Sequence, residues 1–418
     1  MRHFCPVQAQ ASRRTGRRAQ PCGLLFGGIH RLRRSGFMSR LLGYDLSSDG
    51  HHHLYNLTVM QHLRKQNQYE RIGYYTLNAG DELVSELNAA GVKVRNLPPF
   101  RKTGRLGIWQ RTLCLLGMFI YARRHGYDKV HLFHLDSAIL SLLLVLPFTM
   151  GIRVTGTLHW YPTNRLKRWL MMLLIKLRTV DKVAVHGNFT HARILRDGCD
   201  ERKVANIHIP YFKRASEGAE GGGQEIREAL SGRKRPLLLA FGGMRYDKGI
   251  DILMEALGYL RDLDFTLIVA GSEDRFTEAD LDRWAMEYGL SDRLHKDIRY
   301  IPESVKSQYL ELCDAVILPY RSMFSGISGP LTEGAAHGKF VLGPNHGEIG
   351  YTIETYQLGD TFEAENRADL TDKLRKLLNR LHRGGTATAA ANTKTTSLFA
   401  RFIRDEKLFG ENYRKFLA

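Results

Sequence analysis

Short apolar runs alternate with segments of helical period along most of the chain. In the segment after residue 248, for example, Ile250, Leu253, Met254 and Leu257 recur at a spacing that places them on one helical face. Because the apolar runs are nearly continuous, they are typical of strands in parallel sheets covered by helices on both faces. The stretches that contain the predicted strands are 40–46, 70–77, 92–98, 127–140, 152–164, 182–189, 204–212, 237–241, 265–274, 297–303, 315–319 and 340–344.

This alternation is interrupted at Lys213 to Glu225, which is rich in Gly, Glu and Ser and has no apolar period. Such a composition predicts a flexible connection, and 418 residues suffice for two separate cores. We therefore expect two doubly wound, Rossmann-like α/β domains, with a linker between them and a basic, aromatic helix at the end. The predicted ranges are 38–212 and 236–396 for the domains, 213–235 for the linker and 397–418 for the last helix.

The stretch 315–348 contains the first candidate chemistry. A predicted strand ends at Pro319, a loop of Ser and Gly follows, and Pro330 stands where it could open a helix that carries Glu333. Small residues allow close approach of a ligand, and the helix N-terminus near Ser328 would favour a phosphate. Glu333, one turn further on, is placed to accept hydrogen bonds from ribose hydroxyls. An ordinary strand-to-helix corner is the alternative.

The stretch 237–257 repeats this plan. A strand is followed by the Gly242-Gly243 turn, by two cations at Arg245 and Lys248, and then by a helix. The cations would lie near the carboxyl end of the strand, where open α/β sheets bind ligands. Each cation alone is typical of a solvated turn. Together with the loop before Glu333, they predict a diphosphate clamp.

Both stretches carry a family resemblance. FGGMRYDKG resembles the first turn, and SGISGPLTEGAAHGK the E-x7-E loop and helix, of retaining GT-B glycosyltransferases of the family 4 type (glycosyl transferases group 1). The resemblance extends over roughly residues 38–418 and implies two Rossmann-like domains facing a cleft, with a last helix that crosses back. It also implies that Arg245 and Lys248 hold the donor pyrophosphate. Two positions depart from the family: Gly243 stands for a frequent Arg, and Ser325 for the first Glu.

The resemblance implies further site residues. Gly50 fits the first glycine loop, Gly271 lies under the nucleobase, and His159 ends a strand as in the motif T-x-H-D, where His contacts the donor sugar. Trp160 follows where Asp is common, and His134 and Asp136 are weaker candidates; a strand-end His with a structural role is the alternative. The implied catalytic residues are His159, Arg245 and Lys248. The implied donor-binding residues are Gly50, Gly242, Gly243, Arg245, Lys248, Gly271, Ser325, Ser328, Gly329, Pro330, Leu331 and Glu333.

The implied activity is transfer of a sugar from a nucleotide-diphosphate donor to an acceptor hydroxyl, with retention at the anomeric carbon. The acceptor would be a glycan or a lipid-linked sugar in cell-surface polysaccharide or glycolipid assembly. We expect no cofactor and no metal, because Arg245, Lys248 and the helix amides near Ser328 to Leu331 would stabilise the diphosphate without one. Three adjacent histidines, His51 to His53, cannot all face one ion from a regular helix. The alternative is a non-catalytic module of the same fold that binds a glycan or a nucleotide.

The formal charge of +18 is partly local. Residues 1–37 contain eight arginines and no acid, which leaves +10 for the rest of the chain. This segment has no hydrophobic period and is predicted to be disordered. It is an organelle transit peptide or an extension upstream of a start at Met38; we prefer the extension. No nucleic-acid motif accompanies the charge, so we expect no nucleic-acid partner.

Two helical stretches, 108–126 and 164–178, combine apolar residues with cations. They are compatible with an anionic bilayer surface, or with helices packed on a sheet with a solvated basic edge. The nearest approach to a membrane span, 138–150, is too short and contains Pro147. Five scattered cysteines are typical of free thiols in a reducing cytosol. We expect a cytoplasmic protein, peripheral on the inner face of a membrane if the first alternative holds.

Overall fold

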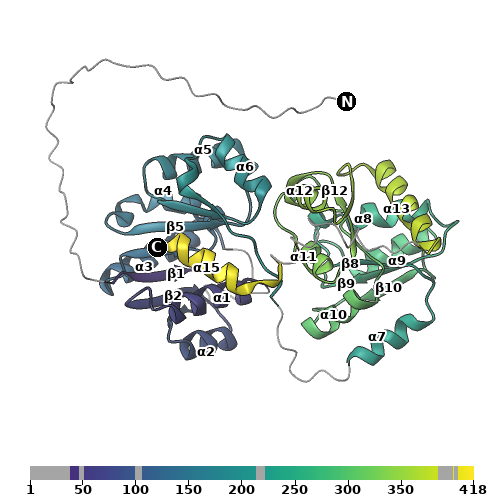
Figure 1. Ribbon diagram of the computed structural model, residues 1–418, viewed down its shortest axis with the longest axis horizontal. Helices are drawn as coiled ribbons and strands as arrows, with labels where there is room; N and C mark the ends of the chain where they lie inside the picture. The colour runs from purple at the N-terminus through teal and green to yellow at the C-terminus, as the bar shows by residue number, and fades with distance from the viewer. Residues whose placement is uncertain (1–37, 47–50, 99–105, 213–221, 385–398, 400–402) are drawn as a thin grey trace, which may run out of the picture. The chain divides into compact units, whose positions relative to one another are not determined.

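The computed structural model describes residues 38–46, 51–98, 106–212, 222–384, 399 and 403–418. The segment 1–37 and Gly50 lie outside the described residues, as do most of the predicted flexible connection and the start of the predicted last helix. Two parallel sheets with helices on both faces dominate the rest (Figure 1). This architecture confirms the predicted α/β class.

The first sheet has seven strands in the order β3-β2-β1-β4-β5-β6-β7. Alternate residues of strand β1 enter opposite cores: Leu42 and Tyr44 pack with α3 to α5, whereas Leu41 packs with α1, α2 and the last helix, α15 (Glu406–Leu417). The strands are β1 (Arg40–Tyr44), β2 (Arg71–Leu77), β3 (Lys93–Leu97), β4 (Lys129–Leu132), β5 (Arg153–Leu158), β6 (Lys182–Val185) and β7 (Val204–Asn206). The helices between them are α1 (His51–Lys65), α2 (Asp81–Ala89), α3 (Ile108–Arg124), α4 (Leu135–Leu144), α5 (Arg165–Lys176) and α6 (Asn188–Arg196), with short turns η1 (Leu146–Thr149) and η2 (Glu201–Lys203).

The second sheet has six strands in the order β10-β9-β8-β11-β12-β13. Its strands are β8 (Leu237–Phe241), β9 (Thr266–Ala270), β10 (Leu294–Asp297), β11 (Ala315–Ile317), β12 (Phe340–Pro344) and β13 (Gly359–Phe362). Its helices are α7 (Gly222–Ser231), η3 (Tyr246–Lys248), α8 (Ile250–Gly258), α9 (Glu278–Glu287), α10 (Glu303–Leu312), α11 (Gly329–Ala336), α12 (Gly347–Tyr356) and α13 (Arg367–His382). In both sheets the strand order reverses beside the first strand, and ligands of open α/β sheets bind at such a switch point.

Three elements differ from the prediction. The strand expected at 297–303 is wrong. β10 begins earlier, at the buried Leu294, and ends at Asp297, and it is these four residues that pair with β9. β13 was not predicted, since only Phe362 in it is a buried apolar residue. Part of the range assigned to the linker forms α7, where Ile226 and Leu230, one helical turn apart, pack into the core of the second sheet.

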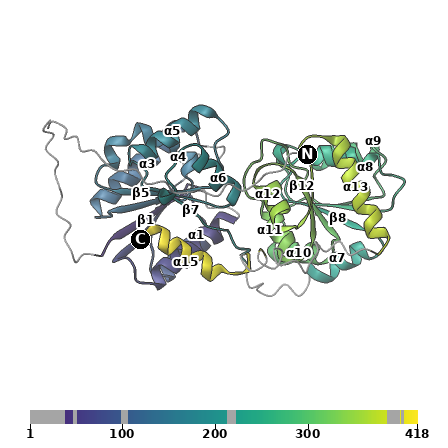
Figure 2. The same cartoon turned by 45° about the horizontal axis from the view of Figure 1, so that its top comes forward.

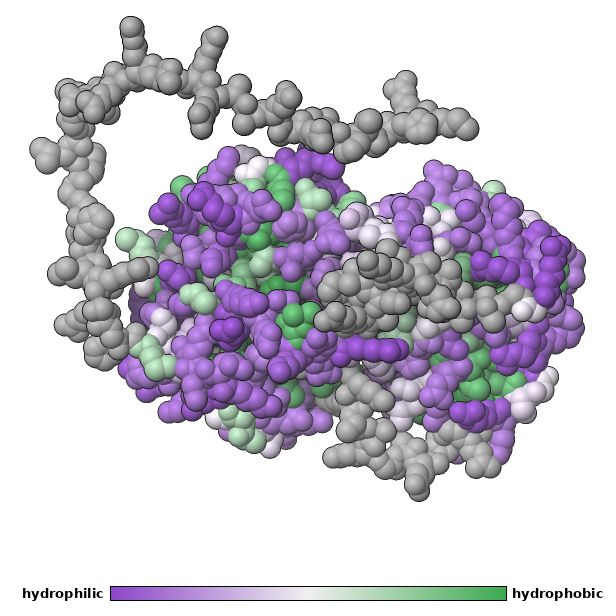
Figure 3. All heavy atoms as spheres, in the orientation of Figure 1, coloured by the Kyte–Doolittle hydropathy of each residue, from purple (hydrophilic) through white to green (hydrophobic). Residues whose placement is uncertain are grey.

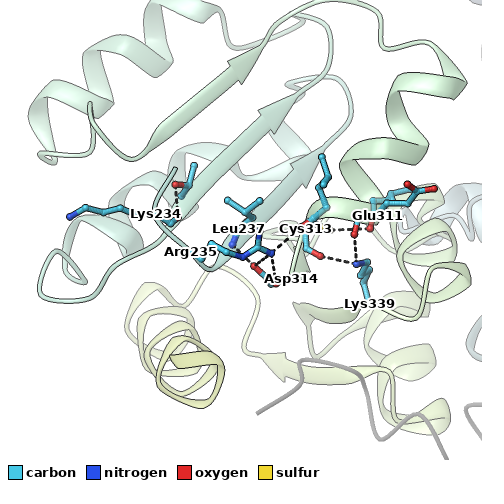
Figure 4. Close-up of polar contacts among 10 residues, drawn as sticks. Lys234, Arg235, Leu237, Glu311, Cys313, Asp314 and Lys339 are labelled. Carbon is cyan, nitrogen blue, oxygen red and sulfur yellow. Dashed lines mark hydrogen bonds and ion pairs between the residues drawn. The ribbon is translucent and has the colours of Figure 1, made fainter. Parts of the chain in front are cut away.

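The amino ends of β8 and β11 are joined by Asp314 (Figure 4). Its carboxylate accepts two hydrogen bonds from the Arg235 guanidinium, at 2.8 and 3.0 Å, and one from the Leu237 amide at 2.6 Å. Lys339 donates to the carbonyls of Glu311 and Cys313 on the same edge. These contacts fix the strand ends that lie opposite the carboxyl edge.

The last helix, α15 (Glu406–Leu417), packs against α1 of the first sheet (Figure 1). Tyr413 is buried and hydrogen-bonds the hydroxyls of Tyr55 and Thr157. The Tyr69 hydroxyl donates to the Leu417 carbonyl at 2.6 Å. The chain therefore returns to its first sheet after completing the second. Among the described residues, no helix combines the length and apolar content that crossing a membrane requires.

Candidate active site

The two motif loops follow neighbouring strands. FGGMRYDKG leaves the carboxyl end of β8, and the loop that leads to α11 leaves the carboxyl end of β11, which pairs with β8. The loops meet at Gly249, which ends η3 with a positive φ of 64° and lies so close to the Pro319 carbonyl that a Cβ would overlap it. Only glycine tolerates both conditions. The sheet order therefore brings together two stretches that are far apart in the sequence.

Lys248 points into the corner between these loops. Its Nζ lies over Gly242, where an added Cβ would be 2.6 Å away, and 5.1 Å from the centroid of the Tyr320 ring. The Tyr320 hydroxyl accepts a hydrogen bond from Ser328 Oγ at 3.3 Å. A small pocket is lined by Gly242, Gly243, Lys248 and Tyr320, among others. The Tyr320 ring therefore lies between the Lys248 ammonium and Ser328, the N-cap residue of α11.

Arg245 is held by its own turn. Its guanidinium makes two hydrogen bonds to Asp247, one of them from Nε at 2.9 Å, and lies 6.0 Å from the Trp160 ring. These hydrogen bonds, followed by the Asp247 charge, raise the pKa of Arg245 although burial opposes them. Asp247 therefore offsets much of the charge that the clamp prediction assigned to Arg245. A second guanidinium, Arg321, follows β11 but is bound to Asp251 at 2.5 Å.

The start of α11 is as the sequence predicts: Ser328 is the N-cap and Pro330 occupies the first turn. The available amides are fewer than expected, because Pro330 has no N–H and the Leu331 amide donates to Ser328 Oγ at 3.4 Å. Gly329 lies beside Glu333, whose Oε1 would be 3.8 Å from a Cβ at that glycine. Ser328 and Leu331 line a second pocket that Glu348 also lines.

Lys306 on α10 holds Glu333. Its Nζ donates to Glu333 Oε1 at 2.8 Å and lies 2.7 Å from Glu303 Oε2. Burial lowers the pKa of Lys306, but the two carboxylates raise it above its ordinary value, so the ammonium stays charged. Glu333 Oε2 is buried and has no partner among the described residues. A carboxylate with one oxygen fixed and the other open suits a vicinal diol.

The remaining donor-side residues lie around this corner. Gly271 ends β9 against the Gly242 carbonyl, where a Cβ would overlap that carbonyl. Gly243 faces more open space, with Ser272 Oγ at 3.4 Å from an added Cβ. Ser325 is 7% exposed, and its Oγ has no hydrogen-bond partner among the described residues. The position where the family has its first Glu is therefore a buried hydroxyl with unused hydrogen-bonding capacity.

The carboxyl edge of the first sheet carries a buried ion pair that the sequence did not predict. Asp45 follows β1 and accepts a hydrogen bond at 3.0 Å from His134 Nδ1, which follows the neighbouring strand β4. Burial alone would lower the pKa of His134, but the Asp45 carboxylate raises it. The His134 ring stacks on His159 with centroids 4.4 Å apart. Only its strand-end position made His134 a weak candidate.

His159 ends β5 and is half-buried. Its Nε2–H donates to the Phe133 carbonyl at 3.0 Å. Trp160, next in the chain, packs edge-on against Phe324 with centroids 4.7 Å apart. An added Cβ at Gly326 would be 3.1 Å from the His159 carbonyl. The strand end that carries His159 thus contacts the loop that leads to α11.

Metal ligands do not gather at this site. Within the described part of the chain, no three His, Cys, Asp or Glu side chains lie together as a metal ion would need. Two Asp-x-Asp triplets occur, 262–264 and 280–282, and both serve structure. Asp262 pairs with Arg375, Asp264 with Lys234 and Asp282 with Lys296, while Asp280 caps α9. His53 pairs with Glu86 at 3.0 Å.

The chain resembles known proteins in part of its sequence and in its fold. Residues 235–380 match the sequence profile of the family described as glycosyl transferases group 1. No curated protein matches the chain. Similar solved structures include Anabaena Alr3699/HepE in complex with UDP (16% identity, 90% of this chain and 98% of that chain, TM-score 0.66) and sucrose-phosphate synthase from Thermosynechococcus elongatus (14%, 90% and 98%, 0.68). A glycosyltransferase from Rickettsia africae is 18% identical over 91% and 98%, with a TM-score of 0.63.

At these identities the likeness to solved structures concerns the fold, which is GT-B: two Rossmann-like sheets, each with its switch point at the carboxyl edge. The profile match covers the second sheet with both motif loops. Residues 235–380 therefore resemble a glycosyl transferases group 1 domain, and this match indicates that the protein is a glycosyltransferase.

Proposed function

We propose that this protein transfers a sugar from a nucleotide-diphosphate donor to an acceptor hydroxyl with retention at the anomeric carbon. The observation that supports this proposal most is the meeting of Lys248, Tyr320 and Ser328 at the switch point of the second sheet. Departure of the nucleotide concentrates negative charge on its diphosphate. A preorganised ammonium aimed at that charge is usually among the largest catalytic contributions.

Each part of the site has a role in this reaction. Lys248 stabilises the leaving diphosphate, and Arg245 contributes to the extent that a phosphate displaces it from Asp247. Glu333, fixed by Lys306, accepts hydrogen bonds from the ribose. In a same-face mechanism the leaving phosphate takes the acceptor proton, so no protein nucleophile is required. His159 contacts the sugar near the reacting carbon, and we expect the reaction to proceed without a metal.

We further propose that the acceptor is a glycan or a lipid-linked sugar in cell-surface polysaccharide or glycolipid assembly, and that the protein acts in the cytoplasm at the inner face of a membrane. Three of its cysteines, Cys114, Cys199 and Cys313, are buried free thiols, as is typical of a reducing compartment. The UDP bound to Anabaena Alr3699/HepE makes UDP-sugars the first donors to test.

The test is turnover of labelled UDP- and GDP-sugars with a lipid extract as acceptor, for the wild type, Lys248→Ala and Glu333→Ala. We expect transfer by the wild type with retention, and a loss of orders of magnitude in both variants. Lys376→Ala, which breaks only an exposed ion pair with Asp372, is the matched control. Wild-type rates in both site variants would remove the clamp. Donor binding without transfer from any donor would instead favour a non-catalytic module, as Ser325 in place of Glu suggests.

A further inference from the structure

Exposed apolar side chains concentrate on one group of helices. Of the seventeen large apolar residues that are exposed among those described, ten lie between Ile108 and Leu177. These ten are Ile108, Trp109, Leu113, Leu140, Leu144, Phe148, Met150, Leu166, Trp169 and Leu177. Trp109 is 71% exposed and Trp169 is 60% exposed. Isolated exposed apolar residues need no explanation, but a contiguous group indicates an interaction surface.

The helices that carry these residues are neighbours. Thr112 Oγ1 on α3 donates to Ser141 Oγ on α4 at 3.0 Å, and the Arg123 guanidinium at the end of α3 donates to the Met150 carbonyl after η1 at 2.7 Å. α4 also packs against α5. Figure 2 shows α3, α4 and α5 side by side on one side of the first sheet. We call the ten residues together the α3–α5 face.

On each helix these side chains are three or four residues apart, which places them on the same exposed side of the helix. Trp109 and Leu113 are four residues apart on α3, Leu140 and Leu144 are four apart on α4, and Leu166 and Trp169 are three apart on α5. Each helix buries its opposite side in the core of the first sheet. The view in Figure 3, which has the orientation of Figure 1, is mainly hydrophilic where it is not grey, with hydrophobic patches between the hydrophilic residues. The unusual feature of these helices is that they carry ten of the seventeen large apolar side chains exposed among the described residues.

The charge around the face is mainly positive. Residues 106–127 and 137–180 contain nine basic residues and no Asp or Glu, although Asp136 lies in the first turn of α4 and Arg153 and Arg168 pair with Asp181 and Asp197. The basic residues are Arg111, Arg123, Arg124, Arg153, Arg165, Lys167, Arg168, Lys176 and Arg178. A second copy of the chain would bring the same excess of positive charge to the interface. An apolar surface with exposed tryptophans and an excess of basic residues instead complements a bilayer with anionic headgroups.

We propose that the α3–α5 face lies on an anionic lipid surface, with Trp109 and Trp169 at the level of the headgroups. α4 and α5 begin near the strand ends that carry His134 and His159, so the face extends from the acceptor-side edge of the first sheet. The proposal rests on the proposed function only in that a bound bilayer would present a lipid-linked acceptor to this edge.

The experiment measures binding of the full chain to vesicles of phosphatidylcholine with and without phosphatidylglycerol. We expect binding that requires phosphatidylglycerol, and a loss of at least about tenfold in partition coefficient for the double variant Trp109→Ser/Trp169→Ser. The matched control is Met286→Ser/Tyr300→Ser, which removes two equally exposed apolar side chains near the second sheet and should leave binding unchanged. Replacing Arg165 and Lys176 by Gln should cost roughly fivefold per charge.

Lipid-borne quenchers make the result independent of residues 1–37, whose arginines could also attract the protein to anionic vesicles. These quenchers should reduce the fluorescence of Trp109 and Trp169, which the double variant lacks. Unchanged binding in that variant, or a change in its oligomeric state with no change in vesicle binding, would overturn the proposal. UDP affinity is measured on the same samples to separate this proposal from the proposed function. Absence of UDP binding by the wild type would count against the proposed function and not against this face.

Discussion

Substitution of Lys306 by Met tests how the proposed nucleotide site is supported. The Lys306 side chain is nearly buried and lies between the carboxylates of Glu333 and Glu303, at 2.8 and 2.7 Å, with the ring centroids of Phe241 and Tyr211 each 5.9 Å from its Nζ. Methionine keeps the length and apolar character of the chain but removes the charge. Both carboxylates then lose their cation in a largely buried position.

The expected cost follows from burial. Removing one partner of a buried ion pair costs about 3–5 kcal/mol. The carboxylates retain 16% and 28% side-chain exposure, so water compensates them in part and we expect about 3 kcal/mol. For a unit of the size of the second sheet and its helices this corresponds to a fall of roughly 6–12 °C in melting temperature. Nucleotide affinity should fall at least about tenfold, because Glu333 is no longer held.

The assay combines calorimetric melting with UDP titration on Lys306→Met, Glu333→Gln and the double variant. Neutralising Glu333 as well should recover much of the lost melting temperature, since one uncompensated carboxylate disappears, but should not recover UDP affinity. Lys376→Ala again serves as the exposed control. A melting temperature within about 1 °C of the wild type for Lys306→Met would refute the assigned role of this ion pair.

Three further predictions concern other parts of the molecule. Although burial opposes it, the Asp45 carboxylate raises the pKa of His134 above its ordinary value, so the Asp45–His134 pair stabilises the protein at low pH and loses this effect as pH rises through the raised pKa. The difference in stability between the wild type and Asp45→Asn should therefore shrink as pH rises in denaturant titrations, and a constant difference would contradict the pairing. Asp314→Ala should lower the melting temperature, because it releases Arg235 and the Leu237 amide, while leaving the KM for the donor unchanged; a raised KM would show that the amino edge shapes the site. Deleting residues 1–37 should leave transfer intact, and its loss would make this segment part of the enzyme.

The sequence predicts those parts of the site that depend on neighbouring residues. Lys248 and Ser328 follow apolar runs that end in glycine-rich turns, and such turns at strand ends are recognisable without a structure. Lys306 could not be found in this way, because it lies on an ordinary amphipathic helix and meets Glu333 only after the chain folds. In the sequence Asp247 lies between Arg245 and Lys248. Its hydrogen bond with Arg245 depends on the conformation of the η3 turn, which the sequence does not show.

The elements of the fold also divide into those that local sequence predicts and those that it does not. Central strands were predicted because both of their faces are buried and their residues are continuously apolar. The edge strands of the first sheet, β3 and β7, were also predicted, but those of the second sheet were not, since β13 buries only one apolar side chain and β10 begins at a single buried leucine. The glycine-rich composition around α7 concealed Ile226 and Leu230, whose spacing of four residues is the only local sign of that helix.

The proposed mechanism requires Lys248 and the start of α11 to bind the same diphosphate. Titration calorimetry of UDP and UMP against the wild type and Lys248→Ala measures this requirement. A charge-assisted hydrogen bond contributes about 1.5–3 kcal/mol, so the variant should bind UDP about 10- to 150-fold more weakly, with little change for UMP. Equal UDP affinity in the two proteins, or equal losses for UDP and UMP, would contradict this requirement.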